Sequence, residues 1–365
     1  MILMENKPLA PFTTLGIGGP ARWFVEAGSE EEIAEAAAWA QEHRAPLFVL
    51  GGGSNLLVAD AGFDGLVLRV GLRGIEVDEA SGVLGEKIYR VAAGEEWENF
   101  VQRTVEDSCA GLECLAGIPG TVGGTPVQNV GAYGQEVASA IERVRAFDLR
   151  EGEFVEFAAD ECGFAYRRSR FNTTDRGRYV VTRVDYRLTP GGAATIRYAE
   201  LERALAEGQA GNSEGREASL AEVAAVVRRI RQSKGMLLVE GDPDCRSAGS
   251  FFKNPVVSEE EYLKIAAANA ASVSSAKAPP RFPAGSGAEN QGRVKVPAAW
   301  LIEQAGFAKG YMLGNTGISS RHTLALVNLG GASAAELLAL ARKITDAVEA
   351  RFGVRLEMEP VMVGF

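Results

Sequence analysis

The N-terminal part of the chain alternates between helical and strand-like spacing of apolar residues. Ser29 and Glu32 form a capping box, and the apolar residues behind it follow helical spacing, which predicts a helix over about residues 30–43. The apolar run 47–50 predicts a buried strand, and the runs 56–58 and 66–70 predict two more. The chain therefore begins as an α/β structure.

The middle of the chain is predicted to be rich in strands. A helix is expected first, at about 96–107, because apolar residues recur at i, i+3, i+4, i+7 and i+8 from Trp97. From Val144 to Leu188, short alternating runs such as 178–182 and 184–188 predict antiparallel strands. Turns are expected at 151–152 and 190–192, where glycine or proline occurs.

Two polar or small-residue segments interrupt the second half of the chain. Residues 206–219 indicate a domain boundary, after which Ser219 and Glu222 cap another helix. Residues 266–292 are rich in Ala, Ser, Pro and Gly, and they predict a helix end followed by a long surface loop. Pro297 suits the first position of the next helix.

The C-terminal pattern predicts a last helix and a final strand. The helix opens at Ser333 and stops at Gly353, a residue that readily adopts the left-handed terminating conformation. In residues 354–359 apolar and polar side chains alternate, which predicts a strand with Arg355, Glu357 and Glu359 on one face.

Length, charge and cysteine usage narrow the range of possible functions. A chain of 365 residues is expected to form two or three domains. Its net charge of −10 argues against a nucleic-acid partner, whereas a small anionic ligand needs only a few local donors. The four cysteines form no CxxC pair and suit a reducing compartment, and two histidines do not suggest a metal site.

Export and membrane insertion are not expected. The first residues lack the basic start and unbroken apolar stretch of a signal peptide. The longest uncharged stretch, residues 114–135, is interrupted by glycines, prolines and amide side chains, so it does not predict a membrane helix.

Two glycine-rich segments are the candidate ligand-binding loops. Residues 51–55, GGGSN, follow a buried strand, and their backbone N–H groups suit a pyrophosphate, although a plain tight turn is the alternative. They do not form a Rossmann fingerprint, because Leu56 takes the place of the third glycine. Residues 116–134 carry many backbone donors, hydroxyls and amides without a charge, which suits a large planar ligand; the alternative is an irregular packed loop.

The motifs together resemble one family. GGGSN, AGIPGTVGGTPVQNVGAYG, FAYRRSRF and AGSFFKNPVV, followed by the tail LEME, occur in the order seen in UDP-N-acetylenolpyruvylglucosamine reductases, the MurB family, and the resemblance runs from about Leu9 to Val361. It implies an α+β fold with a two-part FAD-binding domain of the vanillyl-alcohol-oxidase (PCMH) type and a C-terminal α/β substrate-binding domain. The expected ranges are 1–72, joined by a C-terminal strand at 354–365, then 73–218, and 219–353 for the substrate domain.

The resemblance also implies an activity. Such a chain reduces UDP-N-acetylglucosamine enolpyruvate to UDP-N-acetylmuramate, a cytoplasmic step of peptidoglycan synthesis, with non-covalent FAD and with NADPH as reductant. No metal, nucleic acid, membrane or obligate protein partner is expected. The flavin contacts implied by the motifs are Gly51, Gly52, Gly53, Ser54 and Asn55 at the pyrophosphate and Ile118, Pro119, Gly120, Thr121, Gly123 and Gly124 beside the ring system.

Three residues match the catalytic positions of the family. Arg167 would stabilise the substrate carboxylate as an enolate forms, and Ser250 would donate a proton to the carbon bearing the ether oxygen. Glu359 would assist this step, although Glu357 lies only two residues away. Taken without the motifs, these residues would be a surface arginine, a turn serine and a solvated strand glutamate.

Substrate contacts are implied at four further positions, and Tyr198 resembles the tyrosine that closes over the UDP-sugar in one subclass of the family. The positions are Tyr133, Tyr198, Lys234 and Asn254. The stretch 236–244 is longer than usual in the family, so the match of Lys234 to the family's position is open.

Two other functions are open at this point. An oxidase of the wider fold would use oxygen and would carry a His or Cys for covalent flavin attachment, which neither glycine-rich loop contains. In a non-catalytic nucleotide-binding module, Arg167, Ser250 and Glu359 would be incidental.

Overall fold

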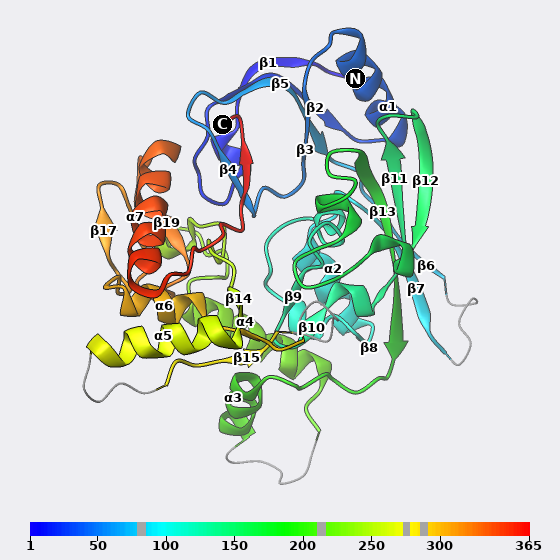
Figure 1. The fold of residues 1–365 in the computed structure, drawn as a ribbon. Coiled ribbons are helices and arrows are strands. Elements are labelled where there is room, and N and C mark those ends of the chain that lie inside the picture. The colour runs from blue at the N-terminus through cyan, green and yellow to red at the C-terminus, as the bar shows by residue number, and fades with distance from the viewer. Residues whose placement is uncertain (79–84, 210–216, 273–277, 285–290) are drawn as a thin grey trace. The chain divides into compact units, whose positions relative to one another are not determined.

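The computed structural model describes residues 1–78, 85–209, 217–272, 278–284 and 291–365 (Figure 1). The chain divides into two compact units, and each is described by itself. The first unit comprises residues 1–7, 21–53 and 63–233. The second comprises residues 8–20, 54–62 and 234–365. The domain ranges expected from the resemblance stay predictions.

A four-stranded sheet carries the start of the first unit. Its order is β1 (Met4–Pro8), β2 (Pro20–Ala27), β5 (Phe63–Val70) and β3 (Leu47–Leu50). β5 runs parallel to both β2 and β3, and α1 (Glu30–Glu42) connects β2 to β3. Ser29 accepts a hydrogen bond from the backbone N–H of Glu32, so the predicted cap and helix are confirmed, as is the strand 47–50.

A second, antiparallel sheet forms most of the first unit. Its strand order is β12-β11-β13-β7-β6, and β8 pairs with the end of β13. The bounds are β6 Ile75–Asp78, β7 Lys87–Ala92, β8 Cys109–Ala110, β11 Ile141–Asp148, β12 Glu153–Ala158 and β13 Tyr179–Pro190. The predicted β-rich middle region and its turn at 151–152 are therefore confirmed.

The predicted separation of 178–182 from 184–188 is wrong, because both runs belong to the single strand β13. Arg183 lies at the junction, and a charged side chain there interrupts the apolar pattern. In the structure its guanidinium contacts Asp185 at 2.7 Å and Glu156 at 2.9 Å. The charge is thus compensated within the sheet, and the strand continues through it.

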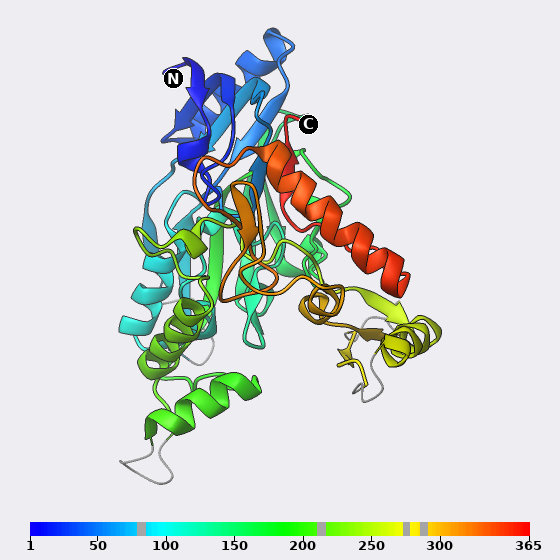
Figure 2. The same cartoon turned by 90° about the vertical axis from the view of Figure 1, so that its left-hand side faces the viewer.

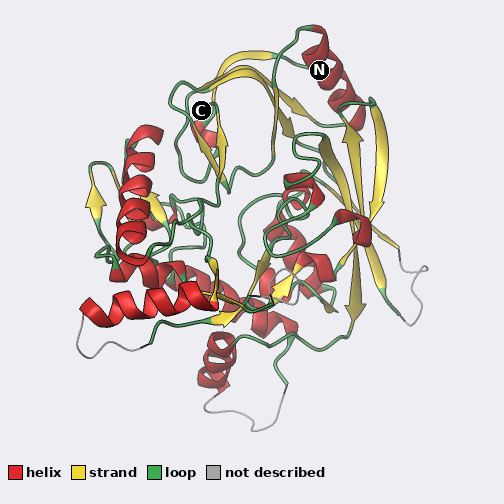
Figure 3. Cartoon of the chain, in the orientation of Figure 1, coloured by secondary structure: helices red, strands yellow, loops and turns green. Residues whose placement is uncertain are grey.

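Helices and short turns complete the first unit (Figure 3). The predicted helix at 96–107 is α2 (Trp97–Glu106), and the helix after Ser219 is α4 (Leu220–Ser233). The predicted boundary at 206–219 begins inside α3 (Ala199–Gln209), a helix that was not predicted, and residues 210–216 lie outside the described residues. The short elements are η2 Glu113–Leu115, η3 Val122–Gly124, β9 Gly131–Ala132, β10 Gln135–Glu136, η4 Val137–Ser139, η5 Ala159–Cys162 and η6 Arg170–Asn172.

In its described residues, the second unit combines small sheets with three α-helices. β4 (Leu56–Val58) pairs in parallel with β20 (Val361–Val363), so an early and a late segment of the chain form one ladder. The remaining strands form two antiparallel sheets. They are β14 Val256–Ser258, β16 Arg293–Lys295 and β15 Phe282–Pro283, and β17 Met312–Leu313, β18 Thr316–Ile318 and β19 Leu326–Asn328. The helices are α5 Glu259–Ser272, α6 Ala298–Gln304 and α7 Ala334–Phe352, with the short turns η1 Ala10–Phe12 and η7 Pro243–Cys245.

The C-terminal helix matches the prediction, but the final strand does not. α7 (Figure 2, red) begins behind the Ser333 cap and ends at Gly353, whose φ is 69°. Of the residues predicted as a strand, 354–359, only Met358 forms a β-bridge, and the regular strand is β20. Pro360 has no backbone N–H, which interrupts a ladder between these two points.

The predicted helix end and loop at 266–292 is described only in part. α5 continues to Ser272, β15 follows at 282–283, and residues 273–277 and 285–290 lie outside the described residues. Across the parts of the chain that are described, none of the helices has both the length and the apolar character required to cross a membrane.

Candidate active site

The two predicted flavin loops lie against each other in the first unit. Gly51, Gly52 and Gly53 follow β3, and a Cβ atom added to Gly52 would lie 2.4 Å from the Cα of Gly120. A Cβ on Gly51 would lie 3.0 Å from the Oγ1 of Thr121. Glycine at position 52 is therefore required by the close approach of two backbones.

The start of α2 holds the second loop in place. The N–H of Trp97 donates to the carbonyl of Gly120 at 3.0 Å, and the N–H of Val122 donates to the carbonyl of Glu95 at 2.9 Å. Trp97 is almost completely buried, so this anchor is part of the core. The loop is thus fixed by the fold before a ligand binds.

Charged residues, one of them buried, anchor the other end of this loop. The buried Arg231 of α4 donates from Nε to the carbonyl of Gly117 at 2.9 Å. Glu98 accepts the N–H of Gly117 and also pairs with Arg228. Burial lowers the pKa of Arg231. Arg231 was not predicted from the sequence, although its position four residues after Val227, on an apolar helix face, was a signal that its charge is buried.

The loop residues fit a flavin. The Oγ1 atom of Thr121 is buried and makes no hydrogen bond within the described residues. Burying a hydroxyl without a partner is costly, so a polar group of a ligand would satisfy it. A Cβ added to Gly124 would find no atom of the described chain within 4 Å. The loop therefore offers an unsatisfied hydroxyl, open space and a backbone without charged side chains. These features suit the polar edge of an isoalloxazine.

Arg167 projects from a tight turn rather than from a regular strand. Ala165 and Arg168 exchange two backbone hydrogen bonds of 3.0 Å, and Arg167 between them has a φ of 55°. Its Nη1 donates to the carbonyl of Gly131 at 3.1 Å. Arg167 is partly buried, whereas Arg168 is exposed. The turn therefore directs Arg167, and not its neighbour, toward the glycine-rich segment.

Tyr133 and Tyr198 are also brought together in the first unit. Tyr133 lies in the turn between β9 and β10, two residues after the carbonyl that Arg167 contacts. The two tyrosine rings meet edge to face with centroids 5.7 Å apart. Burial raises the pKa of Tyr133 to about 12, although Arg231 opposes the effect. Tyr198 is 47% exposed and precedes α3.

Ser250 and Glu359 are brought close in the second unit. Phe252 and Met358 form an isolated antiparallel bridge, and the N–H of Glu359 donates to the carbonyl of Phe251 at 2.9 Å. Glu359 thus pairs with the residue that follows Ser250. Both Ser250 and Glu359 are partly buried.

The register separates Glu359 from Glu357. The backbone of Glu357 accepts from Lys253 at 2.9 Å, and its exposed carboxylate contacts Lys253 Nζ at 2.5 Å. The Glu359 segment is instead held by Asn55, whose Nδ2 donates to the Glu359 carbonyl at 3.4 Å. Glu357 therefore lies at a surface ion pair, farther along the ladder from Ser250.

Ser54, Lys234 and Asn254 are the other predicted residues in the second unit. The amide oxygen of Asn254 accepts a hydrogen bond of 2.9 Å from the N–H of Ala298, the first residue of α6. Lys234 is partly buried in the turn after α4. Ser54 accepts a hydrogen bond from Thr14 through its carbonyl at 3.4 Å.

The two units divide the predicted catalytic residues. Arg167 belongs to the first unit, and Ser250 and Glu359 belong to the second. Their convergence on one substrate carbon therefore stays a prediction. The flavin loop is divided in the same way, since Gly51 to Gly53 lie in the first unit and Ser54 and Asn55 in the second.

Comparisons with known proteins agree with the resemblance. Residues 21–158 match the family model of a FAD binding domain, and residues 242–363 match that of the C-terminal domain of UDP-N-acetylenolpyruvoylglucosamine reductase. The reductase of Thermobifida fusca is 47% identical over 99% of this chain and 98% of its own length. That of Streptomyces coelicolor is 46% identical over 99% of this chain and 90% of its own.

A solved structure extends the similarity to the fold. The crystal structure of UDP-N-acetylenolpyruvylglucosamine reductase (MurB) from Thermus caldophilus has a TM-score of 0.63 and 28% identity, and the match covers 99% of this chain and 98% of that one. With the match to the FAD binding domain, this confirms the predicted α+β fold class. Because closely similar relatives align along nearly its whole length, the chain belongs to the UDP-N-acetylenolpyruvoylglucosamine reductase family.

Proposed function

We propose that this chain reduces the enolpyruvyl double bond of UDP-N-acetylglucosamine enolpyruvate, and that Arg167, Ser250 and Glu359 act on the reacting carbon atoms. The enzyme is a flavoprotein oxidoreductase with FAD as cofactor and NADPH as reductant, and its product is UDP-N-acetylmuramate. The observation that carries the assignment of residues is the pairing of Glu359 with Phe251, which lies next to Ser250.

The cytoplasmic location is part of the proposal. All four cysteines lie in the described part of the chain, and each is a buried free thiol. Burial raises the pKa of the Cys114 and Cys162 thiols to about 12, which makes them poor nucleophiles. Such thiols suit a reducing compartment, where the precursors of peptidoglycan are made.

The chain supplies binding groups and proton chemistry around the cofactor. When bound, FAD reduced by NADPH would supply the hydride for the terminal enolpyruvyl carbon. The glycine-rich loops would hold the cofactor, with the Thr121 hydroxyl available to a polar edge of the ring. Tyr198, which is exposed and contacts Tyr133, would close over the UDP-sugar.

Arg167 would stabilise the charge that develops on the substrate carboxylate. Addition of a hydride to the terminal carbon leaves an enolate, and a guanidinium held in place interacts more strongly with it than with the ground state. One Nη atom is already held by the Gly131 carbonyl, and the turn from Ala165 to Arg168 restrains the backbone. The group is therefore oriented before the substrate arrives.

Ser250 would donate its hydroxyl proton to the carbon bearing the ether oxygen. An enolate is strongly basic, so a hydroxyl suffices as the acid, and a cation such as Lys234 beside it would ease formation of the alkoxide. Phe251 and Phe252 are almost completely buried and anchor the backbone behind Ser250. Glu359 would assist in a protonated or hydrogen-bonded form, because a bare carboxylate would repel the enolate.

Replacing Ser250 with Ala tests this assignment. The variant should bind FAD and be reduced by NADPH as the wild type is, because those steps do not use the Ser250 hydroxyl. Its reduced flavin should then be oxidised by the enolpyruvyl substrate at least 100-fold more slowly, the range over which one proton donor contributes. Turnover at the wild-type rate would reject Ser250 as the donor.

Two control experiments separate the alternatives. Glu357→Gln should leave turnover unchanged, since Glu357 lies at an exposed ion pair with Lys253, while Glu359→Gln should lower it. Denaturation should release the flavin from the chain. Flavin that stayed attached would support an oxidase with a covalent cofactor. An absence of turnover in the wild type as well as in the variants would support a binding module.

A further inference from the structure

A cluster of charged side chains lies beside the segment that leads to Ser250, within the second unit. Arg321 donates from Nε to a carboxylate oxygen of Asp244 at 2.9 Å, and its Nη2 contacts Asp242. Ser320 donates to Asp244 through both its N–H, at 2.9 Å, and its hydroxyl, at 2.6 Å. Asp242 also accepts the backbone N–H of Asp244 at 3.0 Å. We call Arg321, Asp242 and Asp244 the clamp.

The clamp carries fixed charge. Asp244 is only 9% exposed, and its burial is compensated by the hydrogen bonds from Ser320 and Arg321. The hydrogen bond from Arg321 holds the pKa of Asp242 below its usual range. A buried carboxylate that loses its guanidinium partner is destabilised, so the three groups depend on one another.

Three chain segments meet at the clamp. A Cβ added to Gly235, the residue after Lys234, would lie 2.9 Å from the Cβ of Asp244 and 3.3 Å from two nitrogens of Arg321. Asp242 and Asp244 lie on the segment before Ser250, and Arg321 lies between β18 and β19. The residue after Lys234 and a carboxylate six residues before Ser250 therefore lie against the same guanidinium.

The segment around Ser250 is also held by the residues that follow Arg321. The N–H of Asn328 donates to the Arg246 carbonyl at 3.0 Å, and the N–H of Phe251 donates to the Leu324 carbonyl at 2.7 Å. A shift of Arg321 would thus be transmitted to both sides of Ser250.

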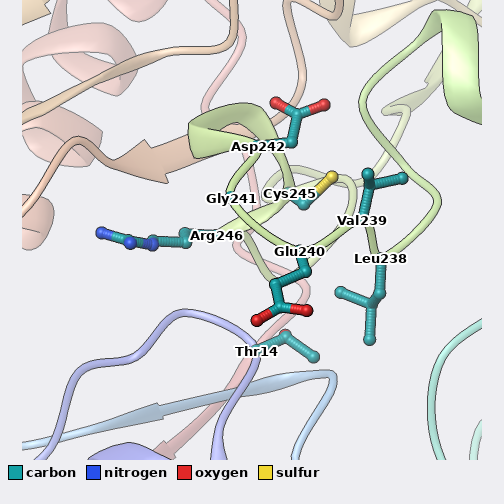
Figure 4. Close-up of a pocket in the computed structure, with 8 residues that line it drawn as sticks. All are labelled: Thr14, Leu238, Val239, Glu240, Gly241, Asp242, Cys245 and Arg246. Atoms are coloured by element: carbon teal, nitrogen blue, oxygen red, sulfur yellow. The ribbon is translucent and has the colours of Figure 1, made fainter.

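The segment before Ser250 has a mostly exposed part, residues 238–243, and a buried part that includes Cys245 and Ala248. Residues 238–242 line a pocket of about 240 Å³, and Leu238 is 54% exposed. In Figure 4 the carboxylate of Glu240 points toward Thr14, and that of Asp242 points to the opposite side. The contacts of Asp242 and Asp244 with Arg321 therefore restrain the exposed part of this segment, whereas the Thr14 hydroxyl, which donates to the Ser247 carbonyl at 2.6 Å, restrains the part nearer Ser250.

We propose that Arg321 is a positioning residue for the reduction, because it holds Asp242 and Asp244 and thereby keeps Ser250 and Lys234 in register. This inference rests on the proposed function of Ser250. The planar guanidinium reaches two carboxylates at once, which an ammonium group does not. Loss of the clamp would displace the proton donor, and a misplacement of about 1 Å is enough to slow a reaction about 100-fold.

The test compares Arg321→Gln with Arg281→Gln. Arg281 also forms an ion pair in the second unit: its Nη1 lies 3.1 and 2.9 Å from the two carboxylate oxygens of Glu259, but both side chains are about half exposed and lie outside the clamp. Both variants should bind FAD and be reduced by NADPH at the wild-type rate. Oxidation of the reduced flavin by the enolpyruvyl substrate, measured anaerobically by stopped flow, should slow about 10- to 100-fold in Arg321→Gln only.

Rescue distinguishes positioning from general destabilisation. Arg321→Lys should recover part of the lost rate, because one cation remains beside Asp244, and kcat should change more than KM. If Arg321→Gln fails to retain FAD, Asp242→Asn provides the same comparison, since Asp242 is the more exposed carboxylate of the clamp. A wild-type rate of flavin oxidation in the folded clamp variant would overturn the inference.

Ser250→Ala, measured in parallel, separates this inference from the proposed function. Slow oxidation in Ser250→Ala with a normal rate in Arg321→Gln rejects only the role of Arg321. A normal rate in Ser250→Ala rejects the proposed function of Ser250, and the inference with it.

Discussion

Replacing Gly52 with Ala should weaken FAD binding, because it forces the two glycine-rich loops apart. The added Cβ would lie 2.4 Å from the Cα of Gly120, 2.7 Å from its carbonyl carbon and 2.9 Å from the backbone nitrogen of Thr121. Carbon atoms in contact normally lie about 3.5–4.0 Å apart, so the backbones must separate by about 1 Å. No flexible side chain is available to move instead.

The magnitude follows from the cost of overpacking. An extra methyl group in a closely packed site costs about 1–3 kcal/mol. In the apoprotein the loops relieve the clash by separating, so the cost falls on the binding of FAD, which needs both loops. The dissociation constant for FAD should therefore rise about 5- to 140-fold, at about 1.4 kcal/mol for each factor of ten.

Titration of the apoprotein with FAD, followed by flavin fluorescence, measures this change. Gly28→Ala is the matched control, because a Cβ on Gly28 would meet only the Glu32 carboxylate, at an ordinary distance of 3.6 Å. Equal FAD affinity in Gly52→Ala and Gly28→Ala would refute the view that close contact between the loops builds the site.

Two further predictions concern single buried contacts in the first unit. Thr121→Val should raise the dissociation constant for FAD about 5- to 12-fold, the value of one hydrogen bond of about 1–1.5 kcal/mol, and Thr121→Ser should restore it; equal affinity in all three would exclude a flavin contact by the hydroxyl. Glu30→Gln should lower the free energy of urea unfolding by about 1–3 kcal/mol at neutral pH, because Glu30 makes two hydrogen bonds to Arg145 and one to Thr182. The Arg145 contact lowers the pKa of Glu30, so this stabilisation is present above the pKa of an unfolded glutamate, about 4.3, and is lost as the pH falls through the lower folded value; a difference between wild type and variant that did not shrink in acid would contradict it.

The sequence determined the local elements well where the signal was itself local. The caps at Ser29 and Ser333 and the terminator Gly353 involve residues within a few positions of one another, and the helices start and stop where these residues predict. The final strand was misplaced because the alternation in 354–359 carries no information about a pairing partner. The predicted break in the strand at Arg183 was wrong for a related reason, since the partner of Arg183, Glu156, lies on another strand.

The sequence by itself also determined the family, and with it the candidate chemistry, because four motifs in one order identify a reductase without any knowledge of contacts. Only the tertiary structure decided which residues are neighbours. The pairing of Glu359 with Phe251, the clamp around Arg321 and the burial of Arg231 join positions far apart in the chain. Such contacts depend on how strands and loops pack, and periodicity, which reports only nearest neighbours along the chain, does not contain them.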